Sequence, residues 1–83
     1  MTDDQIIKLI QNALCQAAPK KAADFANLTM DQKLDALGLD SIAVMEMVGF
    51  VEEHLDVTFN DEDLTDVEHI GDLANLIRAE APS

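Results

Sequence analysis

The sequence predicts an all-α fold: a small four-helix bundle, with three main helices and one short helix, and a long ordered loop between helices 1 and 2. Of the 83 residues, 48% are hydrophobic, while Trp and Tyr are absent and only three Phe occur. Such an aliphatic core suits packed helices better than a sheet. Apolar residues also recur at helical spacing in three stretches. A chain of this length predicts a single domain, 1–83, with a core of limited size.

The first helix is predicted at about residues 3–17. Thr2 and Gln5 are spaced as a capping box, in which each side chain binds the backbone N–H of the other residue. Two aspartates follow Thr2 and favour the positive end of the helix dipole. The expected inward positions are Ile6, Ile10, Ala13, Leu14 and Ala17. Pro19 ends this helix, because proline cannot continue it.

The connection over residues 18–40 is long for so small a domain. Apolar residues spaced along it predict an ordered loop pinned over the bundle: Phe25, Leu28, Met30, Leu34, Leu37 and Leu39. A short helical turn is expected at residues 31–35. Long ordered loops often carry function, and this one leads to Ser41.

The second helix is predicted at about residues 41–54. Gly38 permits a left-handed turn before it, and Asp40 is a preferred capping residue. Ser41 should therefore lie at the helix start, beside free backbone N–H groups. The expected buried stripe is Val44, Met47, Val48, Val51 and Leu55. Ile42 and Met45 fall outside that stripe; they are either ordinary surface or loop-contacting residues, or a docking patch for a partner.

The remainder predicts an extended segment, a short helix at about 60–65 and a last helix at about 69–79. The segment 56–59 contains β-branched and aromatic residues, which interrupt the helical pattern. The last helix should bury Ile70, Leu73, Ala74 and Ile77. Pro82 marks a frayed tail.

The charge is concentrated in the second half of the chain. Residues 1–37 hold five acids and four bases, whereas residues 38–83 hold twelve acids and one base, so the net charge of −12 resides mostly there. Such a surface repels nucleic acid and anionic membrane and attracts basic partners.

Catalysis by this chain is not predicted. No Gly-x-Ser-x-Gly motif surrounds Ser41, and a rise of about 1.5 Å per helical residue places His54 roughly 20 Å away. No metal site is predicted either: the Asp61–Asp72 segment lacks the glycine and glutamate of a calcium loop. Cys15 is the single cysteine and is expected to be a half-buried apolar residue. A lone cysteine and an N-terminus without signal-peptide features indicate a cytoplasmic protein.

Taken together, several motifs resemble the acyl carrier protein family. The main one is Leu37-Gly38-Leu39-Asp40-Ser41 followed by an amphipathic helix. The resemblance extends to the Leu-Thr-x-Asp-x-Lys-Leu run at 28–34, to the acidic pair at 52–53, and to segments 59–64 and 70–77. It covers nearly the whole chain, and its start at Met1 suggests a free-standing carrier.

The resemblance implies a non-catalytic carrier with a covalent 4'-phosphopantetheine, derived from coenzyme A. Ser41 would be the attachment residue, and Asp40 would help to hold Mg²⁺ during the transfer. The thiol of the arm would carry acyl intermediates as thioesters in fatty acid or polyketide biosynthesis. An aminoacyl, D-alanyl or peptidyl carrier and an unmodified helical adaptor remain as alternatives.

The resemblance also implies partners and a docking surface. The partners are a phosphopantetheinyl transferase and acyl-loading, synthase and acyltransferase enzymes with basic patches, meeting a monomeric carrier. The docking residues expected by position are Ile42, Met45, Glu46, Gly49, Glu52 and Glu53. Gly49 replaces the bulkier residue that many family members carry, which makes the patch less standard.

Overall fold

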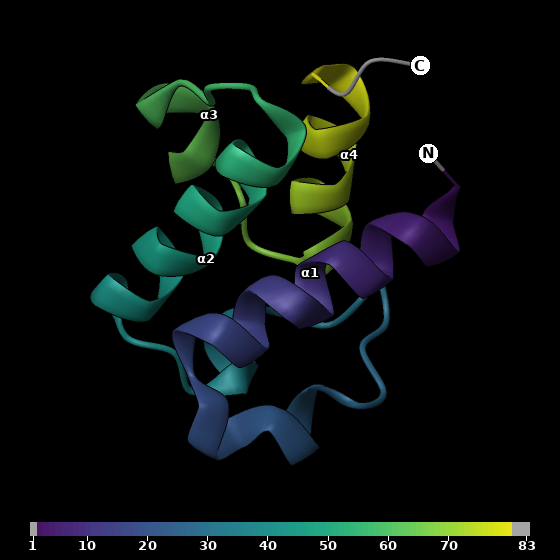
Figure 1. Ribbon diagram of the computed structural model, residues 1–83, viewed down its shortest axis with the longest axis vertical. Coiled ribbons are helices and arrows are strands. Elements are labelled where there is room, and N and C mark those ends of the chain that lie inside the picture. The colour runs from purple at the N-terminus through teal and green to yellow at the C-terminus, as the bar shows by residue number, and fades with distance from the viewer. Residues whose placement is uncertain (1, 81–83) are drawn as a thin grey trace.

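Four α-helices and two short 3-10 segments make up the computed structural model, which describes residues 2–80 (Figure 1). In chain order they are α1 (Asp3–Ala17), the 3-10 segments η1 (Pro19–Phe25) and η2 (Asp35–Leu37), α2 (Ser41–Leu55), α3 (Asp61–Thr65) and α4 (Ile70–Glu80). No strand forms within these residues, which confirms the predicted all-α class. Pro82, the predicted tail, lies outside the described residues.

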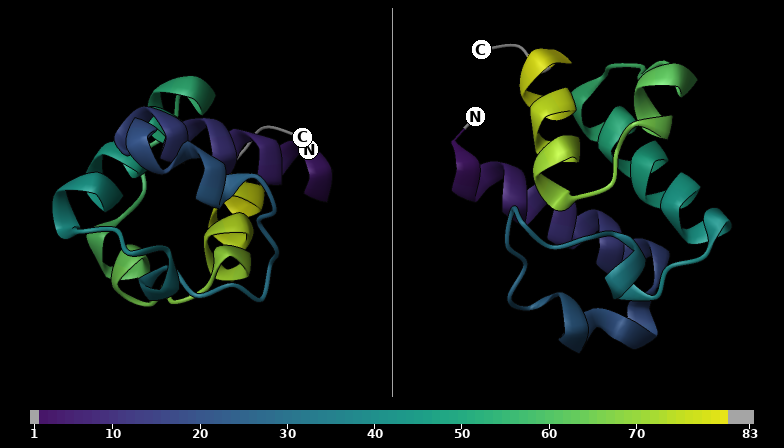
Figure 2. Two further views of the ribbon diagram at one scale, coloured as in Figure 1. Left: turned by 90° about the horizontal axis from the view of Figure 1, so that it is seen from below. Right: turned by 180° about the vertical axis from the view of Figure 1, so that it is seen from behind.

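The helix α1 crosses the bundle and packs against both α2 and α4 (Figures 1 and 2). Its capping box is formed, since Thr2 N–H donates to Gln5 Oε1 at 2.9 Å and Gln5 N–H donates to Thr2 Oγ1 at 3.2 Å. The buried positions are Ile6, Leu9, Ile10, Ala13 and Leu14. Leu9 was not among the predicted core residues, and Ala17 is only half-buried.

The connection between α1 and α2 is ordered and partly helical. Phe25, Leu28, Leu34 and Leu37 are buried as predicted, whereas Met30 and Leu39 are half-buried and pack against the core. The helical turn predicted at 31–35 is wrong: the turn forms later, as η2 at Asp35–Leu37. The segment η1, which begins directly at Pro19, was not predicted.

The turn at 31–35 fails to form because residues 30–34 pair with residues 68–71 instead. Leu34 N–H donates to Glu68 O at 2.9 Å, and Ile70 N–H donates to Gln32 O at 2.8 Å. Gly71 N–H donates to Met30 O at 2.8 Å. These bonds, here called the loop–α4 pairing, use backbone groups that a helical turn would have needed.

Gly71 is required by the closeness of this pairing. A Cβ atom built at Gly71 would lie 3.0 Å from Met30 O. A side chain there would push the loop away from α4, so the absence of a Cβ allows the two backbones to approach.

The second half of the chain follows the predicted order. The helix α2 ends at Leu55, and Asp56 adopts a left-handed conformation with φ 56°. Asn60 precedes α3 but its side chain makes no capping bond there. The helix α4 spans Ile70–Glu80, against a predicted 69–79, and its buried residues are the predicted Ile70, Leu73, Ala74 and Ile77.

The start of α4 is held by the carboxylate of Asp72. Its Oδ2 accepts the backbone N–H of Glu68 and of His69, each at 3.1 Å. The Nδ1 atom of His69 lies 3.3 Å from the same oxygen. These bonds favour the ionised carboxylate and so lower the pKa of Asp72 below its usual 3.8. The bond from the Glu68 N–H has the largest effect.

We expect Asp72→Asn to lower the melting temperature at pH 7. The pKa of Asp72 is depressed in the folded state, so its contribution to stability is present above about pH 4 and is lost as the pH falls further. The difference between variant and wild type should therefore shrink in acid. Thermal unfolding followed by circular dichroism from pH 7 to pH 3 measures this. The exposed Asp66 supplies the matched control, Asp66→Asn, and an equal effect of both variants would contradict the role of Asp72.

A second prediction concerns the core. Leu73 is fully buried, whereas Leu55 is half-buried. We expect Leu73→Ala to lower the free energy of unfolding by about 2–5 kcal/mol, because it leaves a cavity. Leu55→Ala should cost clearly less. Urea unfolding measures both, and equal losses would show that this burial difference does not govern stability.

Candidate functional site

Ser41 is the first residue of α2 and is exposed. Asp40 before it is extended, with φ −86° and ψ 174°, and its Oδ1 accepts the N–H of Ala43 at 2.8 Å. Asp40 is thus the N-cap that the sequence predicted. The cap fixes where the helix begins, and so the position at which the Ser41 side chain leaves the backbone.

The turn before Asp40 depends on Gly38. Gly38 is left-handed, with φ 70° and ψ 26°, and its N–H donates to Asp35 O at 3.2 Å. Its carbonyl oxygen accepts a hydrogen bond from Lys21 Nζ at 2.6 Å. The sequence predicted the turn but gave no signal for the lysine, which comes from η1.

An open hollow lies beside Ser41 at the start of α2. It has a volume of about 380 Å³, and Ser41 and Asp40 lie at its edge. A second pocket of about 260 Å³ adjoins it between α2, α3 and α4. Both are lined by Leu34, Val44, Met45 and Val67. These four shared residues make the hollow beside Ser41 and the second pocket direct neighbours.

The deeper pocket is mostly apolar. Its further lining comprises Met47, Val48, Glu52, Asp61, Leu64 and Leu73. Small-molecule sites are typically concave and apolar with a few polar groups, and this pocket has two carboxylates among aliphatic side chains.

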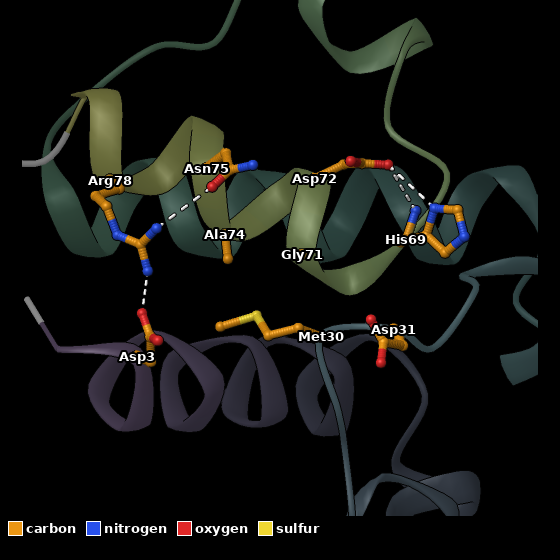
Figure 3. Close-up of a pocket in the computed structure, with 9 residues that line it drawn as sticks. All are labelled: Asp3, Met30, Asp31, His69, Gly71, Asp72, Ala74, Asn75 and Arg78. Carbon is orange, nitrogen blue, oxygen red and sulfur yellow. Dashed lines mark hydrogen bonds and ion pairs between the residues drawn. The ribbon is translucent and has the colours of Figure 1, made fainter.

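Another hollow, of about 400 Å³, lies between the start of α1 and α4 and shares no lining residue with the two pockets near Ser41 (Figure 3). Arg78 points from α4 to Asp3, with which it forms an ion pair, and also donates to Asn75 Oδ1 at 3.3 Å. His69 and Asp72 at its other end bind each other. Of these contacts, the ion pair of Asp3 and Arg78 joins α1 to α4, and the other two lie within α4 and the residue before it.

The family model for a phosphopantetheine attachment site matches residues 5–77. An acyl carrier protein of Exiguobacterium sp. (strain AT1b) is 37% identical over 78 residues, which cover 93% of this chain and 95% of that protein. The chain belongs to the acyl carrier protein family.

Other acyl carrier proteins are similar along the chain. One from Exiguobacterium sibiricum is 30% identical over 81 residues, covering 96% of this chain and 99% of that protein. The acyl carrier protein MbtL of Mycolicibacterium paratuberculosis is 41% identical over 58 residues, covering 69% of this chain and 65% of that protein. Membership implies a covalently attached 4'-phosphopantetheine and interaction with synthase and transferase enzymes in general.

The geometry at the start of α2 fits such a group. An arm attached by a phosphodiester needs an exposed hydroxyl, and Ser41 is exposed. The start of an α-helix favours a phosphate, because free N–H groups and the helix dipole point toward it. The mostly apolar pocket between α2, α3 and α4 lies next to this site.

Most of the predicted docking residues of this carrier lie on the outer side of α2. Ile42 and Met45 are 68% and 73% exposed, which settles that they are surface residues and not core contacts of the loop. Glu46 and Glu53 are also exposed. A Cβ atom at Gly49 would meet nothing within 4 Å, so the glycine leaves open space on this side.

Glu52 differs from the four exposed residues of this set. It is half-buried, and its Oε2 accepts the backbone N–H of Phe59 at 2.9 Å. This bond ties the extended segment after α2 back to the helix, and buried Phe59 lies at the end of that segment. Helical periodicity could not reveal this, because the bond joins the helix to a segment outside it.

The histidines and the cysteine lie apart from the serine. The His54 ring is stacked on Phe50, with 6.2 Å between centroids, at the far end of α2. Cys15 is half-buried and packs against the core, as predicted. In the part of the chain that the structure describes, no three His, Cys, Asp or Glu side chains gather to hold a metal ion. None of the described helices is long and apolar enough to cross a membrane.

Two neighbouring glutamates offer a matched test. Glu52→Lys and Glu53→Lys change the net charge equally, so the two variants are matched in overall charge. We expect Glu52→Lys to lower the free energy of unfolding by about 1–3 kcal/mol, because the Phe59 N–H loses a charged acceptor. Glu53→Lys should change it by about 0.5 kcal/mol or less. Urea unfolding compares the two, and equal stabilities would show that the Glu52 bond contributes nothing.

Proposed function

We propose that Ser41 carries the 4'-phosphopantetheine arm, and that this protein carries acyl intermediates as thioesters in fatty acid or polyketide biosynthesis. The observation that carries the proposal is the exposed serine at the first position of α2, behind the Asp40 cap. The match to the phosphopantetheine attachment model over residues 5–77 supports it.

The attachment step uses the hydroxyl of Ser41. Its Oγ attacks the phosphorus of coenzyme A that bears the pantetheine, and a new P–O bond forms. The pyrophosphate bond of coenzyme A breaks, 3',5'-ADP leaves, and the serine proton passes to a base of the transferase. Ala43 N–H is held by Asp40, so the N–H groups of Ser41 and Ile42 are those left to face the phosphodiester.

Asp40 has a second role in this proposal. The capping bond uses one oxygen, Oδ1, and the carboxylate of Asp40 would also help to hold the Mg²⁺ that accompanies the transfer. Carboxylate oxygens together with substrate phosphates are usual magnesium ligands. One residue would then both fix the start of α2 and place the metal beside the attacking oxygen.

The arm supplies a thiol that forms thioesters, and the bundle shelters the cargo. The pocket of about 260 Å³ between α2, α3 and α4 shares four lining residues with the hollow beside Ser41. Its aliphatic lining removes apolar chain from water, worth about 0.8 kcal/mol per buried methylene. The carrier itself would make and break no bonds in the cargo.

Partner enzymes would meet the carrier at the outer side of α2. Exposed Ile42 and Met45 supply apolar contact, and Glu46 and Glu53 supply negative charge for basic patches on transferases, synthases and acyltransferases. The net charge of −12 also opposes self-association. We therefore propose a monomer, working in the cytoplasm where these enzymes and coenzyme A are found.

The decisive test is intact mass after incubation with coenzyme A, Mg²⁺ and a broad-specificity phosphopantetheinyl transferase. We expect a gain of one phosphopantetheinyl group in the wild type and none in Ser41→Ala. Circular dichroism should show Ser41→Ala folded, with a loss of about 1 kcal/mol or less, because the Asp40 cap stays in place.

Failure would also be informative. A folded wild type that gains no mass with several transferases would overturn the proposal and leave an unmodified helical adaptor. If the mass is gained, loading with acyl, aminoacyl and D-alanyl groups by their respective enzymes separates an acyl carrier from an aminoacyl, peptidyl or D-alanyl carrier.

A further inference from the structure

Lys21 reaches the turn before Ser41 from another part of the chain. Pro19 starts η1, and Lys21 N–H donates to Ala18 O at 3.0 Å, which turns the chain back beneath the start of α2. Lys21 is half-buried, whereas Lys20 beside it is exposed. The side chain of Lys21 ends on the carbonyl oxygen of Gly38, at 2.6 Å.

Lys21 Nζ lies close both to the carbonyl oxygen of Gly38 and to the position that a Cβ atom of residue 38 would take. A Cβ atom built at Gly38 would lie 2.7 Å from Lys21 Nζ, so the ammonium occupies the space a side chain would fill. Gly38 is left-handed at φ 70°, a conformation that a glycine adopts without strain. A hydrogen bond from an ammonium is roughly twice as strong as a neutral one. Lys21 thus binds a turn that lies at the surface.

The turn held by Lys21 leads directly into the modification site. Only Leu39 and Asp40 separate Gly38 from Ser41. Leu39 packs against the core, and Asp40 caps α2 through Ala43. Contacts made by Gly38, Leu39 and Asp40 therefore hold the chain that leads into Ser41. Of these contacts, only the one with Gly38 uses a charged side chain from outside the turn, that of Lys21.

The surroundings of Lys21 are acidic. It lines a hollow of about 310 Å³ together with Asp40, Ile42 and Glu46. Residues 38–83 contain a single base, Arg78, and Arg78 is paired with Asp3. Lys21 brings a positive charge to the end of α2 where the anionic coenzyme A must arrive.

We propose that Lys21 is a positioning residue for the modification of Ser41, acting by holding the Gly38 carbonyl and so the entry of the chain into α2. This inference rests on the proposed function. The transfer remains the one given above: Oγ of Ser41 forms the new P–O bond, and 3',5'-ADP leaves. Lys21 touches neither reactant in this proposal.

The experiment compares Lys21→Met with Lys20→Met in phosphopantetheinyl transfer from coenzyme A. Both remove one positive charge, but only the first removes the bond to Gly38. We expect Lys21→Met to lower kcat/KM by about 10-fold or more, mainly through kcat, because a displaced nucleophile is costly. Lys20→Met should leave kcat unchanged. Lys21→Arg, which keeps the charge and N–H donors, should recover most of the rate.

A second readout separates positioning from folding. Lys21→Met should speed hydrogen exchange at the Ala43 amide, which the Asp40 cap protects, while exchange in α4 stays as in the wild type. Equal transfer rates for wild type and folded Lys21→Met would overturn the inference. A rise in KM that depends on salt and is equal in Lys21→Met and Lys20→Met would also overturn the inference, because the effect would then come from the lost charge alone. An unmodified wild type would instead refute the proposed function itself.

Discussion

The loop–α4 pairing is the constraint on which the rest of this bundle depends. Ordering a long connection costs about 1–2 kcal/mol of backbone entropy per residue. Without the pairing, the buried apolar residues of the connection would have to offset this cost alone. Three backbone hydrogen bonds between residues 30–34 and 68–71 fasten the middle of the connection to the start of α4. Asp72 holds the same end of α4 through Glu68 and His69. The segment that delivers Ser41 is therefore tied to the last helix as well as to the first.

One helix brings together the features that a carrier needs. The first turn of α2 presents Ser41, its inner side lines the apolar pocket, its outer side exposes Ile42, and exposed Met45 lies at the mouth of the pocket. A cargo drawn into the pocket would lie against the inner side of the helix whose outer side we propose for docking. The occupied and empty states of the carrier could then differ in α2 itself, the surface that partner enzymes would contact.

The sequence predicted what local patterns determine. Capping residues and helical periodicity gave the fold class, the Thr2–Gln5 box, the Asp40 cap and the core of α4. The sequence did not predict the features that depend on distant contacts. The loop–α4 pairing displaced the expected turn to η2. Glu52 accepts a hydrogen bond from Phe59, and Lys21 donates one to Gly38. Each of these contacts joins residues that are more than one helical turn apart in the sequence, so helical periodicity does not predict them.

The ion pair between Asp3 and Arg78 has a practical consequence. It holds the start of α1 beside the end of α4, on the side of the molecule away from the first turn of α2 (Figures 1 and 2). Neighbouring chain ends favour circular permutation and the insertion of a domain into a host protein. A larger polypeptide could thus receive this bundle through two adjacent linkers, with the first turn of α2 on the side away from both.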